Sequence, residues 1–376
     1  MTRVLFAGGG TGGHLYPALT LAEALQAERP GLEVHFVGAH RGVEARILPQ
    51  EGVPHTLLPL EPLRRSRPWQ NWRLVPSMAK SLAGLRRLFR SFQPDLFVGT
   101  GGYASGPAGL VALLSGVPVA VQEQNSYPGL TQRWLARGAR QVFLGFPEAR
   151  AHLHPGPRTA IHELGNPVRP PRPDADRAGA RRAFGLAEGG VVALVVGGSQ
   201  GALSVNEALL EALEGVAAGR LPAPPAQAQL LWATGPAHEE AMRARLAPLG
   251  LGWVHVRGYI DDMPRALAAA DVAVSRAGAI MTAELLAWGI PALLVPLPTA
   301  AADHQTHNAH ALDDAGAAVM LPQSGLTGAR LWTELVGLMG DDARRAAMAG
   351  RARERGRPDA ARAIAREMLA LLGEAA

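Results

Sequence analysis

Cysteine is absent from this chain of 376 residues, which excludes disulfides, thiolate metal sites and cysteine nucleophiles. Long apolar runs are also absent, because none approaches the roughly 20 residues that a membrane-spanning helix needs. The chain starts with Met-Thr-Arg and continues directly into the pattern of a buried strand, so we expect no signal peptide. These features together predict a cytoplasmic protein.

Lysine is almost absent, since Lys80 is the only one, and arginine carries nearly all of the positive charge. The net charge of +5 is modest, so its distribution along the chain matters more than its sum. Acidic residues are missing from one long stretch, between residues 63 and 92. No nucleic-acid recognition module accompanies this basic stretch, and no nucleic-acid partner is therefore expected.

Short apolar runs alternate with helix-forming segments along the whole chain. Predicted strands lie at 4–7, 33–37, 96–98, 117–121, 141–144, 191–196, 230–233, 253–256, 272–274 and 292–295. Continuously apolar strands that alternate with helices indicate parallel sheets covered on both faces. A chain of this length is too long for one core. The predicted fold class is α/β, with two Rossmann-like doubly wound parallel-sheet domains facing a central cleft.

The strand and helix pattern breaks once, at Pro170, Pro171 and Pro173 and the charged residues after them. This break is the best candidate for a linker. We expect an N-terminal domain over 1–164, a linker region over 165–190, a C-terminal domain over 191–357, and a helix over 358–376 that packs back toward the N-terminal domain.

Three glycine-rich loops each follow a predicted strand, at 8–13, 99–102 and 197–201. A strand that stops at glycine and restarts as a helix turns backbone N–H groups outward, which suits a phosphate. The first loop has the glycine spacing of a dinucleotide fingerprint, but the second strand ends without a carboxylate and Glu44 comes late. NAD binding is therefore disfavoured, although it stays open at this point.

His14 closes the first loop and is expected at the start of the following helix. The positive end of a helix dipole disfavours a protonated imidazole, which keeps the ring available as a base. The alternative is a histidine that only caps the loop or positions a substrate. The sequence leaves both interpretations open.

Residues 271–284 follow the pattern of a strand, a turn of small residues and a helix. The N-terminus of that helix, near Ala279, would present N–H groups and the positive end of a dipole to an anion. Glu284 lies about one and a half turns further along, where its carboxylate can accept hydrogen bonds from two vicinal hydroxyls. A diphosphate at the helix start and a ribose on the glutamate indicate a nucleoside diphosphate.

Asp174-Ala175-Asp176 has the D-x-D form that holds a divalent cation in some transferases. It lies in the proline-rich break, far from any strand end, so we interpret it as coincidence and expect no metal and no cofactor. The charge of a bound diphosphate must then be met by backbone donors, a helix N-terminus and arginine.

The basic stretch combines a helical stripe with exposed aromatic candidates. Apolar residues at 75, 78, 82, 85, 89 and 92 follow helical spacing and should pack on the sheet. Tryptophans among arginines, just before that helix, are typical of contact with an anionic membrane surface. The residues expected at this contact are Trp69, Trp72, Leu74, Arg64, Arg65, Arg67 and Arg73.

Beyond these separate signals, the sequence resembles the MurG family of glycosyltransferases, which have the GT-B fold. The resemblance covers essentially the whole chain and rests on eight blocks in family order. They are G-G-T-G-G-H at 9–14, G-G-Y-A-S-G-P at 101–107, E-Q-N at 123–125, G-N-P-V-R at 165–169, G-G-S-Q-G-A at 197–202, I-D-D-M at 260–263, R-A-G at 276–278 with Glu284, and D-H-Q at 303–305 before N-A at 308–309.

The resemblance implies that the domain over 1–164 binds the acceptor and associates with the membrane, and that the domain over 191–357 binds the UDP-sugar. It also implies roles for individual residues. The implied donor-binding set is Thr11, Gly12, Gly13, Asn125, Arg169, Ser199, Ile260, Ala279, Ile280, Met281, Thr282, Ala283, Glu284 and Gln305. Within it, Ser199 would bind a phosphate, the Ile260 backbone would read uracil, and Gln305 would hold sugar hydroxyls, with His304 as the fallback. The implied catalytic, acceptor-side residues are His14, Tyr103 and Glu123, with His14 the first candidate for the base and Glu123 the second.

The resemblance also implies a function: an inverting transferase that moves N-acetylglucosamine from UDP-N-acetylglucosamine to the C4 hydroxyl of lipid I. The product, lipid II, serves peptidoglycan synthesis, cell shape and cell division. The implied place is the cytoplasmic face of the cell membrane, as a peripheral protein, with an anionic surface and other cell-wall synthesis proteins as further partners. The alternatives are a UDP-N-acetylglucosamine 2-epimerase, another GT-B transferase, an NAD-dependent oxidoreductase and a non-catalytic nucleotide sensor.

Overall fold

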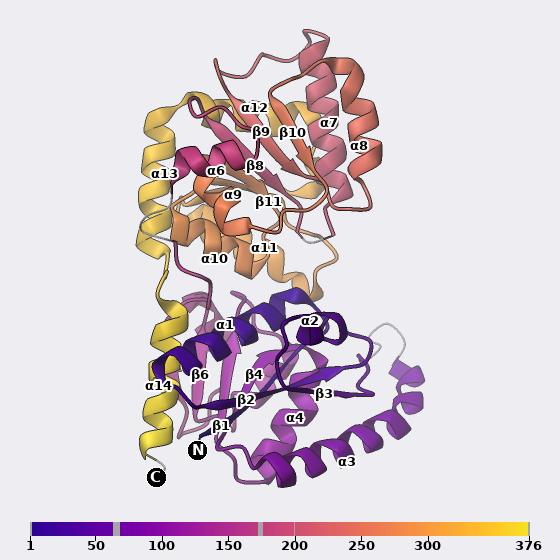
Figure 1. The fold of residues 1–376 in the computed structure, drawn as a ribbon, viewed down its shortest axis with the longest axis vertical. Coiled ribbons are helices and arrows are strands. Elements are labelled where there is room, and N and C mark those ends of the chain that lie inside the picture. The colour runs from indigo at the N-terminus through magenta and orange to yellow at the C-terminus, as the bar shows by residue number, and fades with distance from the viewer. Residues whose placement is uncertain (1, 63–67, 172–175, 199, 375–376) are drawn as a thin grey trace. The chain divides into compact units, whose positions relative to one another are not determined.

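The computed structural model describes residues 2–62, 68–171, 176–198 and 200–374, which form two compact units (Figure 1). Unit 1 comprises Met1–Val168 and Asp359–Ala376, and unit 2 comprises Arg169–Pro358. The chain therefore leaves unit 1 once, builds unit 2, and returns.

Among its described residues, unit 1 holds one parallel sheet in the order β3-β2-β1-β4-β5-β6-β7. The strands are β1 (Arg3–Gly8), β2 (Glu33–Ala39), β3 (His55–Leu58), β4 (Leu96–Gly101), β5 (Val119–Glu123), β6 (Gln141–Leu144) and β7 (Ala160–His162). The order changes direction between β1 and β4, and doubly wound sheets bind ligands outside the carboxyl ends of their strands at such a point. The first two glycine loops follow these two strands.

Helices cover both faces of the sheet of unit 1. They are α1 (Gly12–Glu28), α2 (Glu44–Gln50), η1 (Pro68–Leu74), α3 (Val75–Phe92), α4 (Gly102–Leu114), α5 (Leu130–Leu135), η2 (Pro147–His152) and α14 (Ala360–Glu374). Side chains alternate along β1, so Val4 and Phe6 enter the core on one face, while Leu5 and Ala7 enter the core on the other.

The last helix, α14, packs on unit 1 beside α1, as Figure 1 shows. Its Ile364 and Met368 are fully buried in the same core as Val4 and Phe6 of β1. At the rim of this contact, Glu28 of α1 accepts hydrogen bonds from two exposed arginines of α14. The apolar face of α14 therefore fixes the chain end to the first sheet.

Among its described residues, unit 2 holds a second parallel sheet, in the order β10-β9-β8-β11-β12-β13. The strands are β8 (Val192–Val196), β9 (Gln229–Ala233), β10 (Val254–Arg257), β11 (Val272–Ser275), β12 (Ala292–Leu294) and β13 (Ala318–Met320). The order changes direction between β8 and β11. Two doubly wound parallel sheets confirm the predicted fold class.

The helices of unit 2 are α6 (Arg177–Ala183), α7 (Leu203–Ala217), α8 (Glu239–Leu246), η3 (Ala247–Leu249), α9 (Met263–Ala269), α10 (Ala279–Trp288), η4 (Ala301–Asp303), α11 (His304–Asp314), η5 (Gln323–Gly325), α12 (Gly328–Gly340) and α13 (Asp342–Arg355). The core includes Trp232 of β9 and Trp332 of α12, both fully buried. The indole N–H of Trp332 donates to the Pro222 carbonyl oxygen at 2.8 Å, so its polar atom is satisfied.

The region expected as a linker, 165–190, contains the helix α6, which belongs to unit 2. Arg181 of this helix is buried, and its guanidinium pairs with Asp271 at 2.7 Å and donates to the Ala269 carbonyl oxygen. Proline content alone suggested a linker because this tertiary pairing is invisible in the local sequence. The connection between the units is accordingly shorter than expected.

Candidate active site

The two glycine loops of unit 1 interlock at the point where the strand order changes direction. The Thr100 hydroxyl donates to the His14 carbonyl oxygen at 2.8 Å, and a Cβ at Gly8 would lie 1.8 Å from the oxygen of that hydroxyl. Gly102 has a φ of +79°, and a Cβ there would lie 2.0 Å from the Gly9 carbonyl oxygen. Glycine is required at Gly8 because the Thr100 side chain fills the adjacent space, and at Gly102 because its backbone touches that of Gly9.

His14 is half-buried in the first turn of α1, as the sequence predicted. Its Nδ1 lies 3.2 Å from the Thr11 hydroxyl oxygen. The other edge of the imidazole lies over Gly101, where a Cβ would approach Cδ2 to 2.7 Å. The orientation of the ring is therefore set by one loop through Thr11 and by the other through Gly101.

The Tyr103 side chain of α4 lies against Gly10 of the first loop. A Cβ at Gly10, which has a φ of +89°, would come within 2.7 Å of the Tyr103 ring. Burial, and then the charge of Glu44, raise the pKa of the Tyr103 hydroxyl. This phenol therefore remains a hydrogen-bond donor rather than an ionised group at neutral pH.

Glu44 begins α2, and its side chain reaches the first glycine loop. In the sequence, its position offered only an argument against NAD. Its carboxylate is fully buried and accepts hydrogen bonds from the backbone N–H groups of Gly10 and Ala39, both at 2.9 Å. No local pattern could have found this contact, because 34 residues separate Glu44 from Gly10. One backbone donor of the first glycine loop is thus already occupied.

Glu123 ends β5 and is almost fully buried. One carboxylate oxygen accepts from the backbone N–H of Asn125 at 2.8 Å and from its side-chain amide at 3.1 Å, and the other accepts from the Gly129 N–H at 3.0 Å. Burial raises the pKa of this carboxyl, and the hydrogen bonds from Asn125 and Gly129 oppose that effect. Both oxygens are thus engaged in shaping the loop at 124–129.

In unit 2, α10 begins directly after β11 and its turn, at the second change of strand order. The first turn of a helix leaves N–H groups without intrahelical acceptors, here including those of Ile280 and Met281. The Thr282 hydroxyl donates back to the Gly278 and Ala279 carbonyl oxygens at 3.1 and 3.0 Å. The backbone of this turn, rather than that hydroxyl, is therefore the group that can face an anion.

Glu284 lies one turn further along α10 and is half-buried, as is Ala283 beside it. Burial raises the pKa of this carboxyl to about 7, and the positive charge of Arg169 opposes the shift. Arg169 is the first residue of unit 2 and is exposed. The two residues predicted to reach a donor are therefore close enough to interact electrostatically.

Arg276 lies in the turn between β11 and α10, and the sequence analysis gave it no role of its own. Its guanidinium donates to the carbonyl oxygens of Val295 and Pro296, both at 3.1 Å, and to the Ser204 hydroxyl at 2.8 Å. Burial lowers its pKa, and no carboxylate pairs with it among the described residues. The Arg276 guanidinium thus connects the turn before α10 to the loop after β12 and to the start of α7.

The remaining donor candidates also follow the carboxyl ends of strands in unit 2. Gln305 is half-buried at the start of α11, and its side-chain oxygen accepts from the Leu297 N–H at 3.0 Å. The Nδ1 atom of His304 lies at hydrogen-bond distance, 2.7 Å, from the Ala301 carbonyl oxygen, and burial lowers the pKa of the imidazole. Ile260, after β10, is buried, which suits recognition through its backbone.

The expected membrane surface differs from the prediction at one residue. Trp69 and Trp72 are 71% and 67% exposed, but Leu74 is only 7% exposed and cannot contact a membrane. Val75, expected on the buried stripe, is 64% exposed instead. Trp69 and Trp72 lie on one face of η1, because a 3₁₀ helix has three residues per turn, and Val75 is the first residue of α3, which follows η1 directly.

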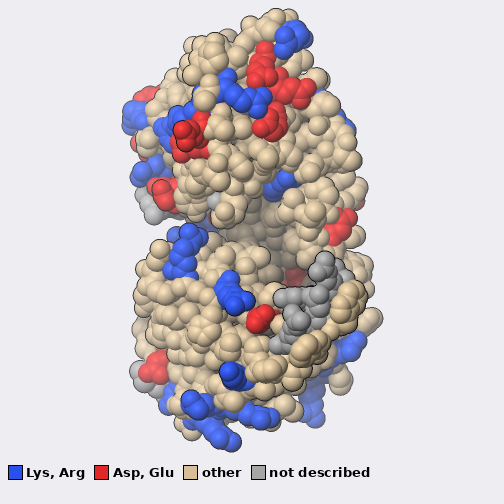
Figure 2. Space-filling model, turned by 90° about the vertical axis from the view of Figure 1, so that its right-hand side faces the viewer, with Lys and Arg blue, Asp and Glu red and all other residues tan. Residues whose placement is uncertain are grey.

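Exposed basic side chains also lie along α3, the helix that follows η1. Figure 2 shows Lys and Arg atoms gathered over the lower part of unit 1, with few acidic atoms among them. The exposed basic residues of α3 are Lys80, Arg86, Arg87 and Arg90. Among the described helices, none is long and apolar enough to cross a membrane.

Several predicted residues lie outside the described residues: Arg64, Arg65, Arg67, Ser199 and Asp174. Arg73 falls within η1. Asp176, the second acid of the D-x-D pattern, is the N-cap of α6 and accepts from the Gly179 N–H at 2.9 Å. In the part of the chain that the structure describes, no group of three or more His, Asp or Glu side chains could hold a metal ion.

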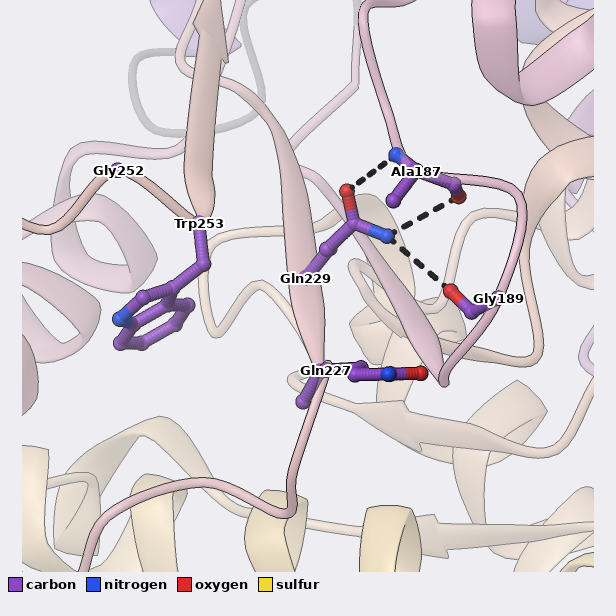
Figure 3. A pocket seen from close by; sticks show the side chains of 7 residues that line it. Ala187, Gly189, Gln227, Gln229, Gly252 and Trp253 are labelled. Atoms are coloured by element: carbon purple, nitrogen blue, oxygen red, sulfur yellow. Dashed lines mark hydrogen bonds between the residues drawn. The ribbon is translucent and has the colours of Figure 1, made fainter.

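An open pocket of about 480 Å³ lies elsewhere in unit 2, at the amino end of β9 (Figure 3). The Gln229 amide, which Figure 3 shows pointing at the backbone of 187–189, accepts from the Ala187 N–H and donates to the carbonyl oxygens of Ala187 and Gly189. Its polar atoms are thus engaged by the protein itself. The pocket lies at the opposite ends of the strands from the candidate site.

Comparison with known proteins identifies both halves of the chain. Residues 4–144 match the N-terminal domain of glycosyltransferase family 28, and residues 192–364 match the C-terminal domain of the same family. The chain is 42% identical over 376 residues to a protein of Moorella thermoacetica, with 98% of each chain covered. That protein is named UDP-N-acetylglucosamine–N-acetylmuramyl-(pentapeptide) pyrophosphoryl-undecaprenol N-acetylglucosamine transferase. A protein of Salinibacter ruber with the same name is also 42% identical, over 98% of this chain and 96% of its own.

Solved structures agree with this result. The crystal structure of MurG from Acinetobacter baumannii matches with a TM-score of 0.74 and 31% identity, over 97% of this chain and 98% of that one. A UDP-N-acetylglucosamine 2-epimerase of Listeria monocytogenes matches with a TM-score of 0.68, but its identity is only 16%. The epimerase therefore shares the fold, while the full-length identity lies with the transferases.

Proposed function

The chain belongs to the MurG family of glycosyltransferases, and from this premise we propose that it transfers N-acetylglucosamine from UDP-N-acetylglucosamine to lipid I, giving lipid II for peptidoglycan synthesis. The observation that carries the proposal is identity of about 40% along essentially the whole length of transferases named for this reaction. Support also comes from the described residues among those that the resemblance selected, since most of them follow the carboxyl end of a strand in the sequence, and ligands of this fold class bind at those ends.

For the donor, we propose that unit 2 binds the nucleotide around α10. The first turn of α10, from Ala279 to Ala283, would face the diphosphate with its backbone N–H groups, and Glu284 would accept hydrogen bonds from the ribose diol. Arg276 would add positive charge where the leaving diphosphate gains negative charge. We keep Arg169, Ser199, Ile260 and Gln305 in the donor site, with the roles that the resemblance implies.

For the reaction, we propose an in-line displacement with inversion. The C4 hydroxyl oxygen of the acceptor forms a bond with the anomeric carbon, the bond from that carbon to the diphosphate oxygen breaks, and UDP leaves. The hydroxyl proton goes to a base of unit 1. Fixed donors aimed at the diphosphate stabilise the charge that develops as UDP leaves.

For the base, we propose His14 rather than Glu123. Thr11 and Gly101 fix the orientation of the imidazole, and its neighbours are loop residues at the carboxyl end of β1. The Glu123 oxygens are engaged by Asn125 and Gly129, which supports a role in shaping that loop. Tyr103 and Asn125 would position acceptor and donor groups, together with Thr11, Gly12 and Gly13.

For location, we propose that the protein works as a peripheral protein at the cytoplasmic face of the membrane, where its lipid-linked acceptor resides. The face formed by Trp69, Trp72 and Val75 would enter the interface, and nearby arginines would contact anionic headgroups. Each basic residue contributes on the order of 1 kcal/mol near such a surface. Other cell-wall synthesis proteins remain proposed partners.

Acceptor dependence separates this function from its rivals. We expect UDP release from UDP-N-acetylglucosamine only when lipid I, or a short-chain analogue of it, is present. An epimerase would release UDP, or isomerise the sugar, without any acceptor. An oxidoreductase would bind NADH, and tight NADH binding without UDP binding would contradict the proposal. A nucleotide sensor would bind the donor without turnover.

A further inference from the structure

Glu44 is a buried carboxylate for which the proposed reaction has no use. It begins α2, and its side chain is fully buried. Its two oxygens accept hydrogen bonds from different strand ends, one from Gly10 after β1 and the other from Ala39 at the end of β2, each at 2.9 Å. The carboxylate thus bridges the first glycine loop and the neighbouring strand.

The space around this carboxylate is shaped by three glycines. A Cβ at Gly9 would lie 2.3 Å from Glu44 Oε1, one at Gly38 would lie 2.4 Å from Glu44 Cγ, and one at Gly42 would lie 2.1 Å from Glu44 Oε2. Any side chain at these positions would displace the carboxylate. The three glycines therefore leave room for the Glu44 side chain, in addition to allowing the loop backbone its shape.

The arrangement has the chemistry of an anion site that is already filled. Backbone N–H groups of a glycine-rich loop after a first parallel strand are the groups that hold a phosphate in dinucleotide-binding folds. Here a carboxylate from the same chain takes one of those donors. A buried charge requires such hydrogen bonds, because an unpaired buried carboxylate is strongly destabilising.

The same carboxylate is linked to the residues proposed to act on the acceptor. Gly10 is held through its N–H by Glu44, and the Tyr103 ring lies against its α-carbon. Thr11 and His14 follow Gly10 directly, and Thr11 contacts the imidazole. The Glu44 charge also raises the pKa of the Tyr103 hydroxyl, so the two side chains interact across the loop.

We propose, building on the function proposed above, that Glu44 is a positioning residue: it fills the anion site of the first glycine loop and holds that loop in the shape that presents His14. A second consequence is specificity, since a nucleotide phosphate cannot occupy the same donors in unit 1. The nucleotide is left to unit 2.

The test compares Glu44→Gln with the wild type. A glutamine offers one acceptor oxygen, and its amide would direct N–H groups at the second backbone N–H. We expect kcat to fall by at least about tenfold, because small displacements of a catalytic group are costly, while the Kd for UDP, which unit 2 is proposed to bind, changes by less than about twofold. Amide hydrogen exchange at Gly10 should become faster.

Met368→Ala is the control for a general loss of stability, since Met368 is fully buried in unit 1 and its removal leaves a cavity far from the loop in sequence. If its melting temperature is lowered as much as that of Glu44→Gln, this variant should keep kcat within about threefold of the wild type. A Glu44→Gln kcat that falls no further than that of Met368→Ala would overturn the proposal. So would unchanged exchange at Gly10.

Glu44→Ala provides a second, chemical test. Removing the side chain beyond Cβ leaves space for acetate, which should slow Gly10 exchange again, whereas chloride at equal ionic strength should not. Acetate without effect on that exchange would contradict an anion site. This exchange readout does not depend on turnover, so absent transferase activity in the wild type would count against the proposed function and not against the role of Glu44.

Discussion

At the residue scale, Glu284 makes the most quantitative prediction, because its pKa of about 7 lies in the range where binding is measured. The ribose diol needs an ionised carboxylate to accept its hydrogen bonds. With that pKa, the ionised fraction falls about tenfold between pH 8 and pH 6, and affinity for UDP-N-acetylglucosamine should fall by about the same factor. Calorimetry in buffers of different ionisation enthalpy should detect proton release on binding at pH 7.

The variant Glu284→Gln should remove this pH dependence and weaken donor binding by about tenfold or more at pH 8, since a hydrogen bond to a charged group is lost. Glu240→Gln, at an exposed glutamate of α8, is the matched control and should change neither quantity. Donor affinity that is independent of pH in the wild type, or unchanged in Glu284→Gln, would refute the ribose role.

The same carboxyl predicts a stability effect of defined sign. Its folded-state pKa lies above the ordinary value of 4.5, so ionisation in the folded protein is unfavourable. Without ligand, the wild type should lose stability relative to Glu284→Gln as the pH rises from about 4.5 to about 7, by no more than about 3 kcal/mol. Urea unfolding at several pH values measures this difference.

The local structure around Glu284 was predictable from the sequence, because β11, the turn and α10 follow one another directly and spacing along the chain was enough. The role of Glu284 itself stays a prediction. Glu44 was missed because its partners lie 34 and 5 residues away and depend on how two strand ends meet. The hydrogen bonds that Glu123 accepts from Asn125 and Gly129 could likewise not be predicted from the sequence, since they depend on the path of the backbone.

At the element scale, η1 decides which apolar residues are exposed. Replacing Trp69 and Trp72 together with serine should reduce binding to anionic vesicles by roughly tenfold, because both indoles are lost from the interface. Turnover of a short-chain soluble acceptor should be unchanged. Vesicle sedimentation and acceptor-dependent UDP release measure the two effects.

Trp134→Ser, at a tryptophan of α5 that is 41% exposed, is the matched control for loss of a surface indole and should keep vesicle binding. A parallel loss of both vesicle binding and soluble turnover in the double variant would mean that the two tryptophans serve the fold of unit 1. Equal binding to neutral and anionic vesicles would argue against a contribution of the nearby basic residues to membrane binding.

Elements were predictable where they are long or continuously apolar. The strands β1, β4 and β8 each combine buried residues with a following glycine loop. The short strands β3, β7 and β13, of three or four residues, were not predicted, because so few residues show no period. The stripe on α3 was placed correctly at Leu85 and Phe89 and failed at Val75, the exposed first residue of that helix.

At the scale of the whole molecule, the chain is two doubly wound units, with unit 2 inserted between the two segments of unit 1. Length and the repeated strand and helix pattern were sufficient to predict this division. They were not sufficient to predict where unit 2 starts, because α6 is joined to unit 2 by the buried contact between Arg181 and Asp271. In the account proposed here, unit 2 supplies the activated sugar and unit 1 supplies the base.

Analysis of the reaction product tests the proposed transfer of N-acetylglucosamine to lipid I most directly. The purified protein, given UDP-N-acetylglucosamine and a short-chain lipid I, should yield one new glycolipid that is heavier by one N-acetylglucosamine residue, with one UDP released for each product molecule. NMR of that product should show a β linkage to the C4 oxygen, as inversion requires. UDP release without acceptor, an α linkage, or a sugar isomerised but not transferred would contradict the account.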